Sequence, residues 1–388
     1  MANNLLVVHG GGPTAVINAS LYGVLTEAQK APEVDKIYAA KNGTGGLLKE
    51  ELLDLTNVGE NEMKRLLTSP GSAIGTSRDP LENEEYNRIV DVLKRHEIKY
   101  VLFNGGNGTM DTCGKVFNKC LELNEDISVI GIPKTMDNDI SITDHSPGFG
   151  SAARYIAQSV KEVCCDVKGL PIHVVVIEAS GRNAGWITAA SALSDPSGKY
   201  APDLIYLPEV PFDENKFLLD VKKVLEKKSG VVVVVSEGLK KMNGEPIVEP
   251  IFTIGRATYF GDVSSHLANL IIKELGYKAR GEKPGLLGRA SIALQSKVDL
   301  EEAILAGKKA FEAVVKGETG KMVAFNRIEG DVYQIDTVLI DIKDVMLIEK
   351  KVPDNFINET KNGVTQEFID WCKPLIGSEM PEMISFND

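Results

Sequence analysis

The feature that most constrains this chain is an apolar strand that runs directly into a glycine loop and then into a helix, and it occurs twice. The first copy comprises the strand Asn4–His9, the loop Gly10–Thr14 and a helix-compatible stretch at 16–30; the second comprises a strand at 100–104, the loop Gly105–Thr109 and a helix to about residue 123. Parallel strands need a crossover connection of this length, which is usually a helix. Both copies therefore predict strands of a parallel sheet.

The same alternation continues along the chain. Further strands are expected at 127–132, 173–178, 204–207 and 231–236, with helices from 148 to Pro171, at 186–193 and at 214–227. Strict alternation of this kind favours parallel sheets with helices on both faces, and 388 residues are enough for two such units. We therefore predict an α/β protein of two Rossmann-like, three-layer α/β/α domains that meet near residues 147–150, with the active site in the cleft between them.

Composition argues against several classes of partner. The 43 Lys and Arg residues face 55 Asp and Glu residues, a net charge of -12, and form no local basic block, so we expect no nucleic-acid partner. Apolar runs such as 231–235 are far shorter than the roughly 20 residues that cross a bilayer, and the first residues lack a secretory signal pattern. The five cysteines have no metal-site spacing and are read as reduced core residues. A cytoplasmic protein without a membrane partner is expected.

The two glycine loops have the character of phosphate sites. A glycine loop between a strand and a helix lets backbone N–H groups and the positive helix end approach an anion. Taken alone, either loop is more simply explained as a tight turn without a ligand, and neither has the Walker A pattern or the complete Gly-x-Gly-x-x-Gly pattern. Two such loops together suggest a polyphosphate ligand.

The loop Pro133-Lys-Thr-Met-Asp-Asn-Asp139 concentrates polar chemistry directly after an apolar strand. Asp and Asn are also common in turns and helix caps for local hydrogen-bonding reasons, which is the simpler interpretation. The functional interpretation is that Asp137 accepts a proton from a substrate hydroxyl, Asp139 supports a divalent cation, and Lys134 stabilises a moving phosphoryl group. These roles match the requirements of phosphoryl transfer.

Several motifs, in order, resemble those of the 6-phosphofructokinase family. They are the opening glycine loop with Asn18, Gly75-Thr-Ser-Arg78, Gly105-Gly-Asn-Gly-Thr109, the 133–139 loop, Ala179-Ser-Gly-Arg-Asn-Ala-Gly185 and Ser236-Glu-Gly238. The resemblance, over about residues 4–320, implies a glycolytic phosphotransferase that uses Mg²⁺ and moves a phosphoryl group from ATP to the 1-hydroxyl of fructose 6-phosphate, giving fructose 1,6-bisphosphate. It also implies a donor-binding domain of 1–147 plus about 293–330 and a sugar-phosphate-binding domain of 148–292 plus about 331–388.

The resemblance also assigns roles to individual residues. The catalytic group it implies is Lys134, Thr135, Asp137 and Arg182, with Asp137 as the base. Donor-binding residues would be Gly11, Gly12, Arg78, Gly106, Asn107, Gly108 and Thr109, and Mg²⁺ ligands would be Asn107, Asp137 and Asp139. Sugar-phosphate contacts would come from Thr135, Asp137, His173, Ser180, Gly181, Arg182, Glu237, Arg280 and Arg289. Part of that site lies near a subunit interface in the family, which implies a homodimer or homotetramer.

Departures from the family pattern bear on the metal, the sugar site and the donor. Asn107 stands where many relatives have an Asp, so the metal there would lose one formal charge or be held through water, with Asp137 and Asp139 compensating. His173 stands where relatives often have an Arg, and it is either a weaker, pH-sensitive phosphate ligand or an ordinary strand residue. Leu286-Leu-Gly-Arg289 lacks the aromatic or His residue that relatives carry before the arginine. Lys134 resembles the pyrophosphate-using branch, but Gly108 lacks the Asp typical of that branch and leaves room for a nucleotide. We expect ATP as the donor, with pyrophosphate as the alternative.

Two other functions fit parts of the pattern. NAD kinases and diacylglycerol kinases share a Gly-Gly-x-Gly-Thr loop but lack the 133–139 and 179–185 motifs. A catalytically weak sugar-phosphate-binding regulatory subunit would fit the changes at Asn107 and His173, but the intact Asp137 argues against it.

Overall fold

The structure is a computed structural model that describes residues 2–170, 173–254 and 257–386. Its packing divides the chain into two compact units, one of residues 1–151 and 289–350 and the other of residues 152–288 and 351–388. The two expected core segments, 1–147 and 148–292, differ from these by only a few residues. The segment 331–350 does not follow the expected division: it belongs to the first unit, because its strand pairs with the strand before it.

The first unit is built on a seven-stranded sheet in the order β13-β12-β5-β4-β1-β2-β3. The strands are β1 Asn4–His9, β2 Ile37–Ala40, β3 Leu52–Asp54, β4 Ile98–Gly105, β5 Ser128–Pro133, β12 Lys321–Arg327 and β13 Ile335–Asp341. The five central strands are parallel to one another, and only the edge strands β3 and β13 pair antiparallel. Three neighbouring strands, β5, β4 and β1, thus end at the same edge of the sheet.

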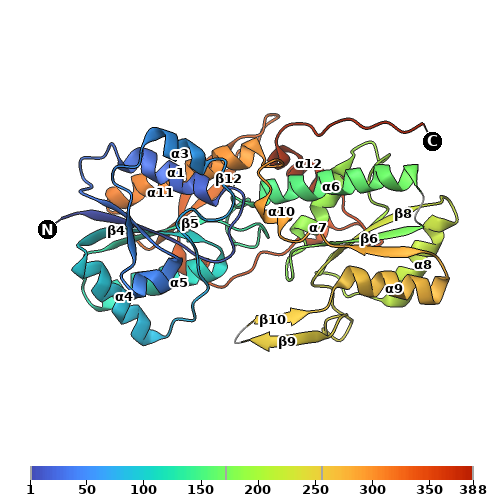
Figure 1. Ribbon diagram of the computed structural model, residues 1–388, viewed down its shortest axis with the longest axis horizontal. Coiled ribbons are helices and arrows are strands. Elements are labelled where there is room, and N and C mark those ends of the chain that lie inside the picture. Colours follow the sequence, from blue (N-terminus) through green and yellow to red (C-terminus); the bar gives the residue numbers. More distant parts are fainter. Residues whose placement is uncertain (1, 171–172, 255–256, 387–388) are drawn as a thin grey trace. The chain divides into compact units, whose positions relative to one another are not determined.

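Helices cover both faces of this sheet (Figure 1). They are α1 Ile17–Ala28, α3 Glu60–Leu66 and α11 Lys297–Val315 on one face, and α2 Gly43–Leu48, α4 Asn83–Arg95 and α5 Asn107–Glu122 on the other. The short helix α10 Leu287–Ala290 lies where the chain passes from the second unit back to the first, and the 3₁₀ turn η2 Ile342–Asp344 follows β13. Successive side chains of β1 alternate between two cores: Leu5 and Val7 pack toward α1 and α11, and Leu6 and Val8 toward α4 and α5. The expected three-layer arrangement is confirmed.

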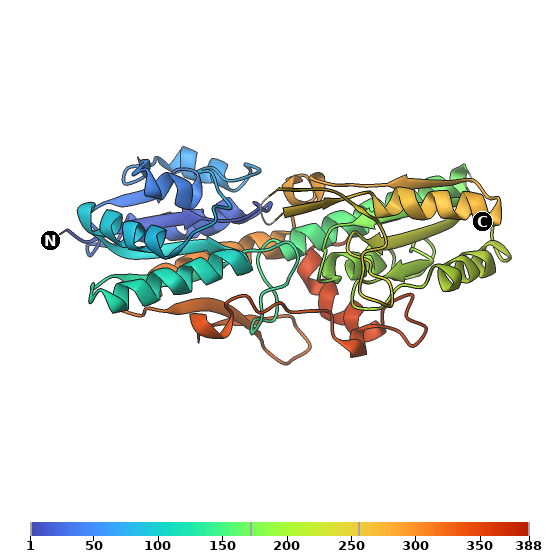
Figure 2. The same ribbon diagram turned by 90° about the horizontal axis from the view of Figure 1, so that it is seen from below.

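The second unit contains a parallel sheet of four strands in the order β11-β6-β8-β7 and a separate antiparallel hairpin. The sheet strands are β6 Val174–Ala179, β7 Leu204–Tyr206, β8 Val231–Ser236 and β11 Ala279–Glu282, and the hairpin strands are β9 Pro250–Ile254 and β10 Ala257–Phe260. The two hairpin strands run side by side in both views (Figures 1 and 2). The valine run of β8 is fully buried at the centre of the sheet, as expected for a parallel strand.

The helices of the second unit complete a three-layer arrangement. They are α6 Phe149–Gly169, α7 Trp186–Ala190, α8 Glu214–Leu225, α9 Val263–Leu275 and α12 Gln366–Cys372, with the 3₁₀ turns η1 Ser191–Ser194, η3 Asp354–Phe356 and η4 Lys373–Ile376. Helices α8 and α9 share an apolar core with β6 and β8 on one face, and α6 and α7 lie on the other (Figure 1). Pro171, expected to end α6, lies outside the described residues.

The cysteines are free thiols, four of them buried and Cys165 half-buried. Burial raises the pKa of Cys120 to about 12 and raises the pKa of Cys113 further. Both therefore behave as core residues, as expected. Among the described residues, no helix is long and apolar enough to cross a membrane.

Candidate active site

Three loops that the sequence singled out meet at the carboxyl edge of the first unit's sheet. Backbone bonds join them, because Gly10 N–H donates to the Asn104 carbonyl at 2.9 Å and Lys134 N–H donates to the Gly105 carbonyl at 3.0 Å. Open parallel sheets bind ligands at this edge. The structure thus brings the two glycine loops and the 133–139 loop together.

Lys134 reaches from the end of β5 into the opening glycine loop. The residue is only 3% exposed, and its ammonium donates to the Gly12 carbonyl at 2.5 Å. Gly11 has φ 75°, which favours glycine, and Lys134 Nζ lies 3.7 Å from the position that a Cβ at Gly11 would take. Burial lowers the pKa of Lys134 to about 8, since the opposing influence of Asp137 is partly offset by Arg78 and Arg289.

Two arginines flank the same loop. A Cβ at Gly12 would lie 2.7 Å from Nη1 of Arg289 and 3.2 Å from Nη2 of Arg78, so both guanidinium groups lie against the loop backbone. Arg78 was expected here. Arg289 was expected to contact the sugar phosphate with Arg280, but it belongs to the first unit, whereas Arg280 belongs to the second. Arg78, Lys134 and Arg289 are called the cation group below.

The 133–139 loop is held by its own side chains. Thr135 Oγ1 donates to Asp139 Oδ1 at 2.9 Å and accepts from Asp137 N–H at 3.1 Å. Asn107 Nδ2 donates to Asp139 Oδ2 at 2.9 Å and to the Asp139 carbonyl at 3.0 Å. Asp139 thus accepts through both carboxylate oxygens and orients the loop, and Asp137 remains half-buried beside it.

The residues expected to hold Mg²⁺ fit a cation with few protein ligands. The amide oxygen of Asn107 is buried, and it has no hydrogen-bond partner among the described residues. The Asp139 carboxylate accepts from Asn107, and the Asp137 backbone is bonded to Thr135 in the same loop. Within the described ranges, no group of three or more His, Cys, Asp or Glu side chains is arranged to hold a metal ion. Mg²⁺ commonly binds through one or two protein oxygens while waters and substrate phosphates fill the other positions.

In the second glycine loop, some positions are packed against neighbouring side chains and one has open space beside it. Gly106 is the N-cap of α5, so it presents backbone N–H groups at the positive helix end. Thr109 is buried, and its side chain fills the space that side chains at Gly10 and Gly105 would need. In contrast, no described atom lies within 4 Å of the position of a Cβ at Gly108. Thr109 therefore packs the loops together, while Gly108 faces open space.

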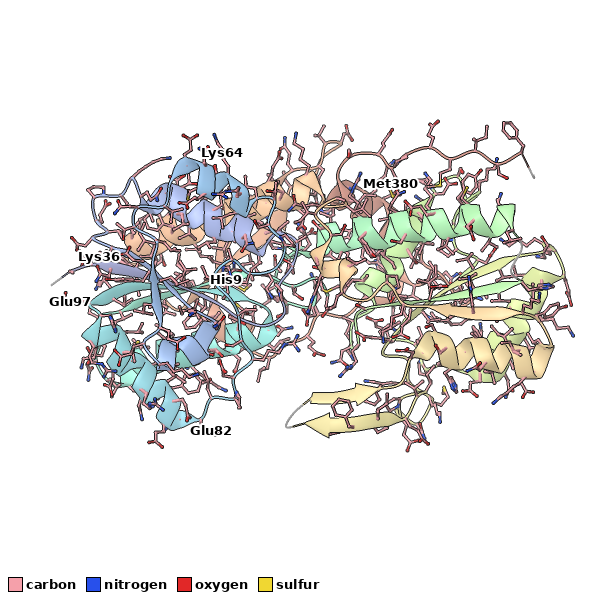
Figure 3. The ribbon with its side chains drawn as sticks, viewed as in Figure 1. His9, Lys36, Lys64, Glu82, Glu97 and Met380 are labelled. Atoms are coloured by element: carbon pink, nitrogen blue, oxygen red, sulfur yellow. The ribbon has the colours of Figure 1, made fainter. Side chains whose placement is uncertain are left out.

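Two supporting residues complete this part of the site. His9 is fully buried at the end of β1 (Figure 3), and burial, followed by the charge of Lys134, lowers its pKa to about 3. Ser72 Oγ donates to the Gly75 carbonyl, so it accepts from His9 Nδ1 at 2.8 Å, which places the proton of neutral His9 on Nδ1. Asn18 donates to the Ser69 and Gly71 carbonyls, each at 2.9 Å, and fixes the segment that leads to Arg78.

In the second unit, the expected sugar-phosphate loop and the 236–238 loop are bonded to each other. Gly181, with φ 113°, donates its N–H to Glu237 Oε1 at 3.1 Å, and Ser236 Oγ donates to the Gly181 carbonyl at 2.8 Å. The guanidinium carbon of Arg182 lies 5.2 Å from the centre of the Phe260 ring. Ser180, Gly181, Arg182 and Glu237 therefore gather at the carboxyl ends of β6 and β8.

Sequence reasoning missed Glu209, which anchors this loop. Its Oε1 accepts from Gly185 N–H at 2.8 Å and from Val352 N–H at 3.0 Å, and burial raises its pKa. No local motif marks it, because its partners lie 24 and 143 residues away.

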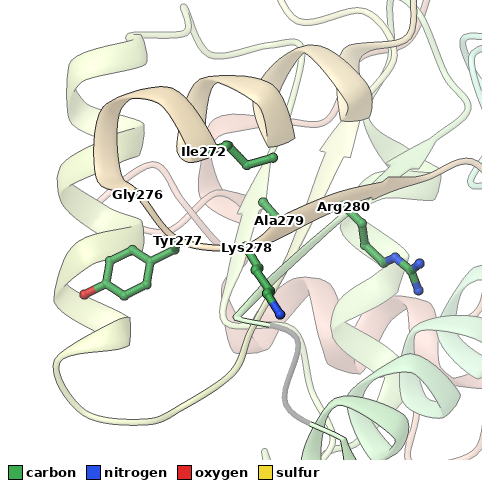
Figure 4. Close-up of a pocket in the computed structure, with 6 residues that line it drawn as sticks. All are labelled: Ile272, Gly276, Tyr277, Lys278, Ala279 and Arg280. Carbon is green, nitrogen blue, oxygen red and sulfur yellow. The ribbon is translucent and has the colours of Figure 1, made fainter.

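The structure does not bring His173 and Arg280 to this loop within the chain. His173 precedes β6, whereas Ser180 follows it, and Arg280 pairs in register with Val175 near the start of that strand. The His173 ring lies 5.5 Å from the Tyr277 ring, and Tyr277, Lys278 and Arg280 line a surface pocket of about 460 Å³ (Figure 4). His173 and Arg280 thus lie near the opposite end of the strand from the sugar-phosphate loop.

Comparisons with known proteins identify the family. The family model described as Phosphofructokinase matches residues 4–314. The pyrophosphate–fructose 6-phosphate 1-phosphotransferase of Xanthomonas campestris is 37% identical over 97% of this chain and 92% of its own length, and the enzyme of that name from Rhodospirillum rubrum is 36% identical over 99% and 96%. The crystal structure of a pyrophosphate-dependent phosphofructokinase from Nitrosospira multiformis superimposes with a TM-score of 0.89 at 36% identity, over 99% of this chain and 94% of that one. The chain belongs to the phosphofructokinase family and is a phosphotransferase.

Proposed function

We propose that the chain transfers a phosphoryl group from pyrophosphate to the 1-hydroxyl of fructose 6-phosphate, which gives fructose 1,6-bisphosphate and orthophosphate. The observation that carries the donor assignment is the cation group, in which a buried ammonium and two guanidinium groups converge on Gly11 and Gly12. Three cations around one short loop suit a small anion of high charge density, and guanidinium groups bind phosphate oxygens in pairs. The names of the relatives also favour pyrophosphate over the ATP expected from the sequence.

The residues have distinct chemical roles in this proposal. Asp137 accepts the proton of the 1-hydroxyl as its oxygen forms a bond to phosphorus, while the bond from phosphorus to the leaving orthophosphate breaks. Lys134 and Arg78 neutralise charge on the donor, and Thr135 holds the backbone of Asp137. Ser180, Gly181, Arg182 and Glu237 would bind the sugar phosphate.

Mg²⁺ would neutralise charge between the two phosphates of the donor when bound. Asn107 would present its unpartnered amide oxygen to the ion, with Asp137 beside it and Asp139 orienting Asn107. Because Asn107 is neutral, the protein would contribute less negative charge to the ion than an Asp would at this position.

ATP is a second candidate donor because of the space beside Gly108. ATP is longer than pyrophosphate, because its α-phosphate and nucleoside extend beyond the β- and γ-phosphates. No described atom lies within 4 Å of the Cβ position at Gly108, so this position leaves space for them. A carboxylate at this position would fill that space with negative charge. We therefore expect Gly108→Asp to lower any activity with ATP far more than activity with pyrophosphate.

A side-by-side assay tests the donor. Purified enzyme with saturating fructose 6-phosphate and Mg²⁺ is supplied with pyrophosphate or ATP, and fructose 1,6-bisphosphate is measured directly. Turnover with pyrophosphate and little with ATP supports the proposal, and the reverse supports the second candidate. Melting shifts with these ligands but no bisphosphate would identify a binding protein without catalysis.

The cellular setting and assembly belong to the same proposal. We place the enzyme in the cytoplasm as a homodimer or homotetramer. His173 and Arg280, which lie away from the sugar-phosphate loop of their own chain, would then contact sugar phosphate bound by another subunit.

A further inference from the structure

Residues 349 and 350, a segment outside the region matched by the family model, contact the loop that carries Asp137 and Asp139. The match ends at residue 314, whereas Lys350 N–H donates to the Asp139 carbonyl at 2.7 Å and Glu349 forms an isolated antiparallel bridge with Ile140. All of these residues belong to the first unit. The segment therefore extends the backbone bonding of the loop immediately after the expected catalytic residues.

The Lys350 side chain adds a second set of contacts on the same loop. Its ammonium donates to the Asp144 carbonyl at 2.9 Å and the Thr143 carbonyl at 3.0 Å, and it lies 3.4 Å from Asn138 Oδ1. One side chain thus joins three points of the 138–144 segment, which has no helix or strand of its own. The ammonium satisfies carbonyl groups that would otherwise need other donors.

The loop needs such support because of its backbone conformation. Asn138 and Ile142 have φ values of 52° and 56°, in the left-handed region. This region costs a β-branched residue such as isoleucine roughly 1–2 kcal/mol. Residues in such conformations persist where the surroundings determine them. At the end of the loop, a ring nitrogen of His145 lies 2.6 Å from Glu302 of α11, and Lys350 adds its own bonds to the segment before His145.

We propose that Lys350 is a positioning residue for phosphoryl transfer: its bonds to the 138–144 segment hold Asp137 and Asp139 in the geometry that proton removal from the acceptor hydroxyl requires. Lys350 acts through the loop and not on the reactants. The inference rests on the proposed function for its catalytic part, whereas the bracing of the loop can be measured without turnover.

The kinetic test compares Lys350→Met with Lys350→Arg. Methionine keeps the approximate length but loses every donor of the ammonium, so we expect kcat to fall on the order of 10–100-fold while KM for fructose 6-phosphate changes less than about twofold. Arginine keeps a charged donor and should restore part of kcat. Lys343→Met is the matched control, since Lys343 is in the same unit and its side chain is 74% exposed. Unchanged kcat in Lys350→Met, or a loss explained by lower melting temperature alone, would overturn the proposal.

The structural test is hydrogen–deuterium exchange of peptides that cover residues 134–147. We expect faster exchange there in Lys350→Met, no change in Lys343→Met, and no change in peptides from the second unit. If the wild-type enzyme transfers a phosphoryl group from neither donor, the proposed function fails. The exchange measurement then decides by itself whether Lys350 holds the 138–144 segment in place. If exchange is unchanged in Lys350→Met, the proposal that Lys350 holds this segment is wrong, whatever the activity.

Discussion

At the scale of single residues, the site depends on charges that the protein holds away from water. Lys134 is the clearest case, because the residue is only 3% exposed, Arg78 and Arg289 repel its charge, and its ammonium still donates to the Gly12 carbonyl. The cost of burying the charge is what lowers its pKa to about 8. A phosphate anion would relieve this cost by pairing with the ammonium. The enzyme without donor should therefore lose this proton at a lower pH than the donor-bound enzyme does.

A pH profile tests this property of Lys134. In the free enzyme the ammonium loses its proton as pH rises through about 8, so the KM of the donor should rise above that pH while kcat changes less. Lys134→Arg keeps its charge at every accessible pH and should remove the inflection, whatever its effect on the absolute rate. Kinetics with saturating sugar phosphate between about pH 6.5 and 9.5 provide the measurement. A donor KM that stays flat in the wild-type enzyme would contradict this assignment.

Asp137 is the residue whose loss should affect chemistry most. Removing a general base commonly lowers kcat by about 10²–10⁴-fold, and we expect Asp137→Ala to fall in this range with the fold retained. Asp139→Ala should also lose thermal stability, because both oxygens of Asp139 accept hydrogen bonds within the loop. Stopped assays and thermal melts of the two variants separate these effects. Full activity of Asp137→Ala would exclude the assigned role.

At the scale of secondary-structure elements, helix α11 anchors the end of the segment that follows the 133–139 loop, through buried ionisable side chains. His145 is 1% exposed, and its ring nitrogens lie 2.8 Å from Asp144 and 2.6 Å from Glu302. Burial alone would lower the pKa of His145, but Glu302 and Asp144 outweigh it and raise the pKa above its ordinary value of 6.5. Tyr333 also donates to Glu302, at 2.5 Å. Glu302 of α11 thus joins His145, at the end of the loop, to Tyr333 in the segment after β12.

The stability contribution of His145 should depend on pH in a defined direction. Because the folded-state pKa is raised, the contribution is fully present below about pH 6.5 and is lost as pH rises through the folded-state pKa. His145→Gln, which cannot carry the charge, should cost on the order of 3 kcal/mol near pH 6 and less near pH 9. Urea unfolding of both proteins across this range provides the measurement. A difference that grows with pH would show that His145 is neutral in the folded protein.

Elements with strong local patterns were predictable, and elements without them were not. Strands β1, β4 and β5 are continuous apolar segments that end in glycine or polar loops, so their positions and their shared edge followed from the sequence. Strand β13 was missed because an edge strand with mostly exposed or half-buried residues lacks an apolar signal. Its pairing with β12 also explains why residues 331–350 belong to the first unit.

The same reasoning applies to side chains in the site. Lys134 and Asp137 could be predicted because their own motif marks them. Lys350 and Glu209 could not, since Lys350 contacts a residue 206 positions away, Glu209 contacts residues 24 and 143 positions away, and no motif surrounds either of them. Arg289 was expected to bind the sugar phosphate, but its contact with Gly12 joins residues 277 positions apart, which local pattern does not specify. Family resemblance therefore pointed to the 133–139 loop but not to the distant residues that bond to it.

At the scale of the whole molecule, the net charge of -12 opposes the approach of polyanionic substrates. The cation group offsets this at short range, where Coulomb interactions among partly buried charges are screened less by salt. Each member of the cation group should therefore contribute strongly to binding the phosphorylated ligand. Arg289 is the member whose ligand most needs a test, because family resemblance assigns it to the sugar phosphate whereas its side chain lies against Gly12, as that of Arg78 does.

Ligand-dependent melting of the whole protein can assign Arg289 to one ligand. A ligand at about 100 times its dissociation constant stabilises the folded state by about 2.7 kcal/mol, so pyrophosphate with Mg²⁺ and fructose 6-phosphate should each raise the melting temperature of the wild type. If Arg289 binds the donor, as its contact with the Gly12 loop indicates, Arg289→Met should lose most of the pyrophosphate shift and keep the sugar-phosphate shift. Arg280→Met is the matched control, since Arg280 lies in the other unit and should give the reverse pattern. Loss of only the sugar-phosphate shift in Arg289→Met would return this arginine to the role that family resemblance implied, and would leave Arg78 and Lys134 as the cations that bind the donor.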